Sequence, residues 1–283
     1  MKYWEISTNR TYAKYRMVIR LCRIIRTLKN WAKIMENSTE VAENLRNVWN
    51  NVWNIFAPDN SWKDDQSKRT MIKEKLVYFS PEHSESVEHI DKVIKALTRG
   101  VALTQAAVDW KYPTIGDESF SRKKGRTPHE KLRGVQWRLV IAYSGFEITA
   151  KGLMNYFERN TKPKIIQDFI NKCSLPSYSK LEPPTPKEKS NLEKWLIKKE
   201  DEAIAEFLGV TAGDAKIINH WLVSSQAVCN WQEAVKLAKA LRNTTAHGFL
   251  QPTKVGRWKL KNSFRILAEN LAEIMTYGLR TLV

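Results

Sequence analysis

The sequence predicts an all-α protein that folds as a helical bundle. In most long segments, apolar residues recur every three or four positions, the spacing that gathers them on one face of a helix. Between these segments, proline and glycine interrupt the period and mark loops. At 283 residues the chain is long enough to bury a core, either as one large domain or as two small ones.

The chain is strongly basic, with a formal net charge of +17. Such a surplus of positive charge indicates the partners of a protein rather than its fold. Nucleic acid, RNA in particular, is the first candidate partner, and an anionic membrane surface is the second. The 11 tryptophans require a core, an interface or stacked bases to cover their rings.

The three cysteines are scattered, and no CxxC or Cys/His cluster accompanies them. A zinc site or disulfide framework is therefore not expected, which fits a cytoplasmic protein. No paired carboxylates or Gly-rich phosphate loop stand out, so we expect neither a metal nor another cofactor. No apolar run approaches about 18 residues and the N-terminus lacks a signal-peptide pattern, so no membrane span or export is expected.

The first part, 1–115, is expected to be a basic helical region. Residues 10–36 form a basic amphipathic pattern, which suits docking within the protein, contact with RNA phosphates or binding to a membrane surface. A second helix is expected over 38–56, with Trp49 and Trp53 four apart and in the core. A loop is expected over 58–67, and 71–79 fits either a helix or a strand.

The clearest helix of this part follows Ser84 or Ser86, either of which is a suitable N-cap. Apolar residues at three-four spacing carry it to Val108. His83 and His89 flank its start, six residues apart, with no carboxylate or cysteine at a metal-ligand spacing. Both histidines are therefore expected at the surface.

Residues 116–130 are the best candidate for a linker, because proline and glycine interrupt any period around them. They contain a basic run that is either a solvated segment or a loop contacting RNA phosphates: Arg122, Lys123, Lys124 and Arg126.

The second part, 131–283, begins with a long helix over 131–159 that is apolar around most of its circumference. Such a helix is normally buried. It contains Glu147, and a buried carboxylate needs a partner. Lys151, one turn further on, and Arg242, far along the chain, are both suitable partners.

A proline-rich insertion around 160–190 follows, with a short helix over 165–173. Further helices are expected over 190–209, 211–223 and 262–279, and the apolar face of the last packs in the bundle or forms a dimer interface. A stretch without an acidic residue precedes this last helix. Its cations are candidates for contacts with RNA phosphates: Lys254, Arg257, Lys259 and Lys261.

The most specific pattern in the chain is Leu241-Arg242-Asn243-Thr244-Thr245-Ala246-His247-Gly248, at the end of another amphipathic helix. Asn230 is a suitable N-cap for that helix, and Gly248 followed by Pro252 predicts its end. His247 is therefore expected in or just after the last turn.

The geometry of a regular helix separates the two most reactive groups of this pattern. Asn243 and His247 share a face, whereas Arg242 and His247 are about 140° apart. One regular helix does not aim both at a single atom. Either the last turn is distorted, or a site would take residues from two copies of the motif.

Arg242-Asn243-x-x-x-His247, late in an all-helical chain, resembles the Arg-x4–6-His motif of the HEPN superfamily. Many members are metal-independent ribonucleases, among them toxins, phage-defence proteins and the nuclease domains of type VI CRISPR effectors. The resemblance covers roughly 133–283. It implies a site shared between two HEPN domains, in a homodimer or with a second HEPN subunit. It also implies an acidic residue that faces the motif from an earlier helix, a place suited to Glu147.

The chemistry that the resemblance implies is transesterification within RNA, in which the 2′-hydroxyl attacks the adjacent phosphate. His247 suits proton transfer because imidazole titrates near neutral pH. Arg242 suits the charge on the phosphorane, and Asn243 suits a hydrogen bond to a phosphate oxygen or to the His ring. Glu147 would orient Arg242. DNA would be refused because it lacks the 2′-hydroxyl.

Other interpretations of the same residues stay open. Arg242 can cap helix carbonyls or pair with an acid, while Asn243 and His247 can satisfy backbone groups at a helix end. The alternative function is a catalytically inactive HEPN-like subunit that binds RNA or protein in a larger nucleoprotein complex. A third is an unrelated basic helical protein that binds nucleic acid or a membrane surface.

Overall fold

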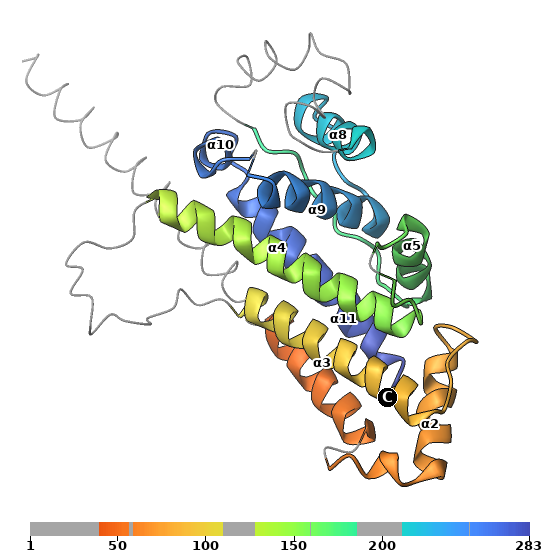
Figure 1. Ribbon diagram of the computed structural model, residues 1–283. Coiled ribbons are helices and arrows are strands. Elements are labelled where there is room, and N and C mark those ends of the chain that lie inside the picture. The colour runs from red at the N-terminus through yellow and green to blue at the C-terminus, as the bar shows by residue number, and fades with distance from the viewer. Residues whose placement is uncertain (1–39, 57–58, 110–127, 159, 186–210, 249) are drawn as a thin grey trace, which may run out of the picture. The chain divides into compact units, whose positions relative to one another are not determined.

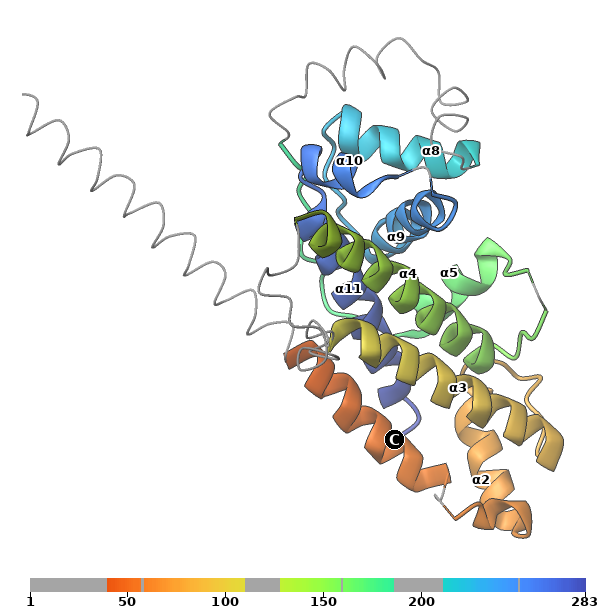
Figure 2. The same cartoon turned by 60° about the vertical axis from the view of Figure 1, so that its left-hand side comes forward.

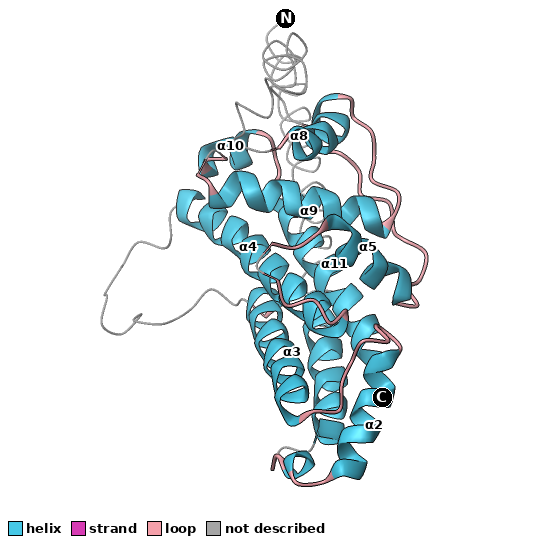
Figure 3. Ribbon diagram, turned by 45° about the vertical axis from the view of Figure 1, so that its right-hand side comes forward, coloured by secondary structure: helices cyan, strands magenta, loops and turns pink. Residues whose placement is uncertain are grey.

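The computed structural model describes residues 40–56, 59–109, 128–158, 160–185, 211–248 and 250–283. Within them every regular element is helical, and one isolated antiparallel bridge joins Leu181 and Val228. Contacts group Val41–Val283 into one compact unit. The fold of this unit is an all-α helical bundle, as the sequence predicts (Figure 1, Figure 3).

The bundle is organised around one helix pair, α3 and α4, which lie side by side in both Figure 1 and Figure 2. The helix over 40–56 lies beside α3, and α9 lies along α4 with α8 on its far side. In chain order after the helix over 40–56, the elements are η1 (Ser61–Lys63), α2 (Gln66–Val77), α3 (Val87–Val108), α4 (Pro128–Leu153), α5 (Pro163–Lys172), α8 (Ala212–Ile218), η2 (Asn219–Val223), α9 (Trp231–Ala246), α10 (Pro252–Arg257) and α11 (Lys261–Arg280).

Small residues let α3 and α4 approach until their backbones touch. A Cβ added at Gly145 would lie 2.5 Å from the carbonyl oxygen of Gly100, and one added at Gly100 would lie 2.7 Å from that of Gly145. Each added Cβ would also collide with a threonine of the facing helix, Thr104 or Thr149. Gly and Thr are four apart on both helices, so the crossing is locally reciprocal.

The apolar face of α11 packs inside the bundle, which decides between the two predicted roles for this face. Phe264, Leu267, Leu271 and Ile274 are fully buried, and α11 contacts α3, α4, α5 and α9. Trp49 and Trp53, predicted to be core, are partly buried and pack against the core with ring centroids 5.7 Å apart.

Several predicted bounds change. The ambiguous segment 71–79 is mostly the end of helix α2, which begins at Gln66 after its N-cap Asp65, so the predicted loop over 58–67 is shorter. Helix α4 ends at Leu153 rather than at 159, and Asn155 beyond it has a φ of 53°. Helix α10 was not predicted, since six residues are too few to show a period.

The prediction that His83 and His89 are surface residues is wrong for His83, which is only 3% exposed. Its Nε2 lies 2.7 Å from the carbonyl oxygen of Leu153, and its Nδ1 lies 2.9 Å from Nε2 of His89. Burial lowers the pKa of both imidazoles. The pair therefore joins the start of α3 to the end of α4.

Other predictions fall outside the described residues, namely the basic helix over 10–36, the helix over 190–209 and the basic run Arg122, Lys123, Lys124 and Arg126. The domain boundary over 116–130 stays a prediction, although α3 and α4, on its two sides, pack together. None of the helices in the described ranges combines the length and apolar character of a membrane span.

Candidate functional site

Arg242 lies near the end of α9, and its guanidinium is held from three directions. One terminal nitrogen donates to Oδ1 of Asn243 at 2.9 Å, and the other lies 3.8 Å from Oε2 of Glu147 on α4. The guanidinium carbon lies 5.4 Å from the ring centre of Tyr143. The Arg242 side chain is still 30% exposed. It is therefore oriented by the protein and accessible from solvent.

The surroundings of Arg242 do not use all its donors. Burial raises the pKa of the Tyr143 hydroxyl, and the neighbouring Glu147 carboxylate raises it further, so the ring beside the guanidinium is a neutral π face. Each terminal guanidinium nitrogen carries two N–H bonds. The Nε of Arg242 is buried and has no acceptor among the described residues. Because Nε is buried, the donors that an anion can reach are the remaining N–H bonds of the terminal nitrogens, in a side chain that is 30% exposed.

Asp214 on α8 connects a third helix to this cluster. Its Oδ2 accepts a hydrogen bond from the Asn243 amide at 2.9 Å, and its Oδ1 lies 3.4 Å from Nζ of Lys239. Thr211 caps α8 by accepting the backbone N–H of Asp214. A polar chain therefore runs from Asp214 through Asn243 and Arg242 to Glu147, across α8, α9 and α4.

His247 is the C-cap residue of α9 and is exposed. The predicted N-cap and end of this helix are confirmed: Asn230 accepts the Glu233 N–H at 2.8 Å, and Gly248 has a φ of 77°. No side chain of the described residues hydrogen-bonds the imidazole of His247. Its ring is therefore open to a ligand, to solvent or to another protein chain.

The helix is regular through Ala246, so a distorted last turn does not bring Arg242 and His247 together. Arg242 turns toward α4, whereas His247 is exposed at the helix end. The angular separation expected of a regular helix is retained. Of the two predicted solutions, the site that uses two copies of the motif stays as a prediction.

Glu147 was expected to be buried, but its side chain is 25% exposed. The reason is that α4 is not buried around its whole circumference, since Ile148 is half-buried and Trp137 is exposed. Thr161, beyond this helix end, donates its hydroxyl to Oε1 of Glu147 at 2.5 Å. Of the two predicted partners, Arg242 lies within ion-pair distance of Glu147, at 3.8 Å. The Nζ of Lys151 lies 5.8 Å from the Tyr156 ring centre, and its pairing with Glu147 stays a prediction.

The predicted RNA-binding cations in this part of the chain gather around α10 and the start of α11. Arg257 and Lys259 are exposed, while Lys254 and Lys261 are half-buried. Burial lowers the pKa of Lys261, and the positive charges of Lys131 and Arg265 lower it further. Crowded cations of this kind favour an anion nearby, but their contact with RNA stays a prediction.

Sequence reasoning missed three residues of the polar cluster: Tyr143, Thr161 and Asp214. Tyr143 lies four residues before Glu147 and therefore on the same face of the helix, so its place beside Glu147 could have been predicted from the spacing. No pattern in the sequence indicated Asp214, because only the packing of α8 on α9 brings it to Asn243. Thr161 lies in the segment expected to be irregular.

In the described residues no group of three or more His, Cys, Asp or Glu side chains is arranged to hold a metal ion. The two cysteines in these ranges, Cys173 and Cys229, are free thiols. Comparison of the chain with protein-family models, with curated proteins and with solved structures finds no match.

Proposed function

We propose that the chain is a metal-independent endoribonuclease of the HEPN type, acting on RNA as a homodimer or beside a second HEPN subunit. The observation that carries the proposal is the state of Arg242. It is fixed by Asn243, Glu147 and Tyr143, yet it is 30% exposed with unused donors, and it lies five residues before an exposed His247.

The reaction needs two functions that these residues can supply. The 2′-oxygen bonds to phosphorus and loses its proton to a base, while the bond from phosphorus to O5′ breaks and O5′ takes up a proton. His247 is suited to these proton transfers. Arg242 is suited to the negative charge on the non-bridging phosphate oxygens, since its planar fork matches two of them.

Glu147 and Asp214 would act as positioning residues. Glu147 orients the guanidinium from α4, and Asp214 orients the Asn243 amide, which in turn accepts from Arg242. Because Arg242 and His247 diverge on one helix, a composite site would take one of them from each copy. A defence, toxin or CRISPR-associated setting is part of this proposal and depends on the motif resemblance.

A second candidate, an inactive RNA- or protein-binding subunit, is favoured by one observation. The Asn243 side chain already bonds Asp214 and Arg242 at 2.9 Å each. If RNA does not displace these bonds, Asn243 has little left to offer a reacting phosphate, and the cluster serves binding alone.

The test is cleavage of fluorescent single-stranded RNAs with EDTA present. Wild type is compared with Arg242→Ala, with His247→Ala and with Arg99→Ala, a control that removes an exposed arginine of α3. The first two variants are expected to lose at least 100-fold in rate, as for removal of a proton-transfer group, while the control keeps the wild-type rate. A 2′-deoxy substitution at the cleaved position should block the reaction.

Binding of an uncleavable 2′-O-methyl RNA and circular dichroism serve as controls for affinity and folding. Cleavage that is unchanged in His247→Ala would overturn the site. RNA binding without cleavage by wild type would favour the second candidate. Sedimentation of the wild type over a range of concentrations tests whether activity follows the dimer.

A further inference from the structure

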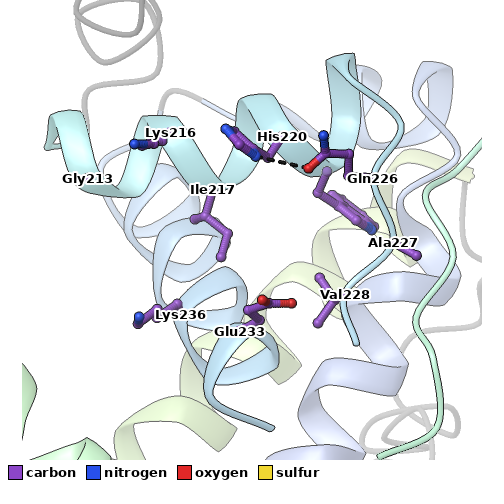
Figure 4. A pocket seen from close by; sticks show the side chains of 10 residues that line it. Gly213, Lys216, Ile217, His220, Gln226, Ala227, Val228, Glu233 and Lys236 are labelled. Carbon is purple, nitrogen blue, oxygen red and sulfur yellow. Dashed lines mark hydrogen bonds between the residues drawn. The ribbon is translucent and has the colours of Figure 1, made fainter. Parts of the chain in front are cut away.

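A pocket distinct from the Arg242 cluster opens between α8, η2 and the first turns of α9 (Figure 4). Its volume is about 310 Å³, at the lower end of the range for pockets that hold small molecules. Ile217 and Val228 contribute apolar surface. Chemically active side chains surround it: Lys216, His220, Trp221, Gln226, Glu233 and Lys236.

The two ends of the pocket differ in chemistry. Lys216 on α8 and Lys236 on α9 lie at one end, on facing helices, while Gln226 and Val228 lie toward the other (Figure 4). Both lysines are exposed. Two ammonium groups on opposite walls are suited to one phosphate group. The other end is suited to a flat ring with polar edges.

Polar groups at that second end are already oriented. Nδ1 of His220 lies 3.1 Å from Oε1 of Gln226, the contact drawn in Figure 4. Oε2 of Glu233 accepts the backbone N–H of Cys229 at 3.1 Å. The second oxygen of this carboxylate can accept from a ligand amino group, and the Gln226 amide nitrogen can donate. Acidic and amide side chains read base edges in this way.

The backbone around the pocket departs from regular helix. η2 is a π-helix that carries His220 and Trp221, and Ser225 just after it has a φ of 55°. π-turns and left-handed non-glycine residues are both enriched at functional sites. The indole nitrogen of Trp221 is buried without an acceptor in the described part of the chain, a further feature that demands a reason.

The pocket and the candidate site both include residues from one side of α9. Lys236 and Asn243 are seven residues apart, so they lie within about 20° on the helix and about 10 Å apart along its axis. Lys239, between them, is held by Asp214. A stacked nucleic-acid strand advances about 3.4 Å for each nucleotide. A strand that leaves the pocket and runs beside α8 would cover this distance to Asn243 in about three nucleotides.

We propose that this pocket binds one nucleotide of the RNA strand, with Lys216 and Lys236 on its phosphate and its base against Ile217 and Val228. Glu233 accepts from the exocyclic amino group of that base, which cytosine, adenine and guanine have and uracil lacks. The inference deepens the proposed function, because it gives the ribonuclease a base preference about three nucleotides from the scissile phosphate.

The first experiment measures binding of CMP, UMP and cytidine by isothermal titration calorimetry to the full chain carrying His247→Ala, so that cleavage plays no part. CMP is expected to bind at least tenfold tighter than cytidine, which lacks the phosphate, and several-fold tighter than UMP. Adding Lys216→Ala and Lys236→Ala should weaken CMP at least tenfold. The matched control is Lys92→Ala with Lys95→Ala, two exposed lysines of α3.

A conservative variant distinguishes recognition of the base from recognition of the phosphate. Glu233→Gln keeps an acceptor for the Cys229 N–H and should remove the preference for CMP over UMP while leaving the preference for CMP over cytidine. No binding of CMP at millimolar concentration overturns the pocket, as does CMP binding that the two lysine substitutions leave unchanged.

Competition decides whether the ligand is a free nucleotide or part of a strand. A short 2′-O-methyl RNA should displace CMP from the His247→Ala protein, and failure to displace it overturns the assignment to RNA. The proposed function fails separately, through the absence of cleavage in wild type. If the wild type cleaves RNA and the variant with Lys216→Ala and Lys236→Ala binds RNA with unchanged affinity, the pocket assignment is wrong and the proposed ribonuclease function is retained.

Discussion

The α3–α4 crossing and the end of α9 are held together in opposite ways. At the crossing, Gly100 and Gly145 bring two backbones into contact, with no space for even one added carbon. At the end of α9, Arg242 is positioned by charge and hydrogen bonds across three helices, and remains 30% exposed. The first region tolerates no change of volume, whereas the second tolerates exchange of partners. A binding site requires the second property.

The largest loss of stability is expected at the α3–α4 crossing. We expect Gly145→Ala to destabilise the bundle by about 3 kcal/mol, the upper part of the usual range for overpacking, because the new Cβ meets the Gly100 carbonyl oxygen at 2.5 Å. The measurement is urea denaturation followed by circular dichroism.

Gly213→Ala on α8 is the matched control for this loss. Nothing lies within 4 Å of its added Cβ, and alanine favours helix over glycine, so stability should rise by up to about 1 kcal/mol. Equal effects of the two substitutions would mean that helix propensity, and not close packing, determines the response at Gly145.

The polar chain should show a smaller cost that depends on chemistry rather than volume. Asp214→Ala leaves the Asn243 amide without its acceptor and is expected to cost about 2 kcal/mol. Asp214→Asn keeps an oxygen at the same place and should recover more than half of that loss. If both variants were equally unstable, the hydrogen bond to Asn243 would not be what stabilises the contact between α8 and α9.

The contact between buried His83 and half-buried His89 makes the stability of the bundle depend on pH. Since a carbonyl only accepts, Nε2 of His83 carries the proton, and His89 donates to its Nδ1. Burial lowers the pKa of His83 in the folded state from 6.5. The unfolded chain therefore binds more protons, and the stability gained from the neutral ring is complete above pH 6.5 and lost as the pH falls below it.

Unfolding free energies measured between pH 7.5 and 5.5 should fall by at most about 1.4 kcal/mol for each pH unit from this one group. His83→Gln should flatten the curve in that window. A wild-type curve that is no steeper than that of His83→Gln contradicts the assignment.

The smallest effect on stability is expected at Glu147, whose ion pair with Arg242 is long and partly exposed. Glu147→Gln should change the free energy of unfolding by less than about 0.5 kcal/mol, as for solvent-exposed pairs. Under the proposed function it should still lower the cleavage rate, because the guanidinium loses its orientation. A large loss of stability with unchanged activity would make Glu147 part of the scaffold.

The long helices could be predicted from the sequence because each has a continuous apolar face. In α3 and α11 the apolar face is buried at the positions that the three-four spacing predicts. The capping residue Asn230, and Ser86 as one of two candidates, could also be recognised in the sequence. The π-turn at Asn219–Val223 and the short α10 were not predicted. Segments of five or six residues are too short to show a repeating apolar spacing, so tertiary packing determines their conformation.

The candidate site was predictable in part. The need of a carboxylate for a partner led to two candidates for Glu147, Lys151 and Arg242, and Arg242 lies 3.8 Å from a carboxylate that is less buried than expected. Asp214 and the pocket beside it depend on how α8 lies on α9, which no residue spacing within either helix specifies. The crossing of Gly100 and Gly145 likewise requires both helices to be seen together.

The position of α11 has a consequence for how the chain folds during synthesis. This helix supplies the buried face that α3, α4, α5 and α9 share, yet it follows all of them in chain order. At 5–20 residues per second a ribosome needs about ten seconds to go from the end of α4 to the end of α11. Until then the apolar surface of α3 and α4 that α11 covers has no partner from α11, so this interval is when the nascent chain is most exposed to aggregation.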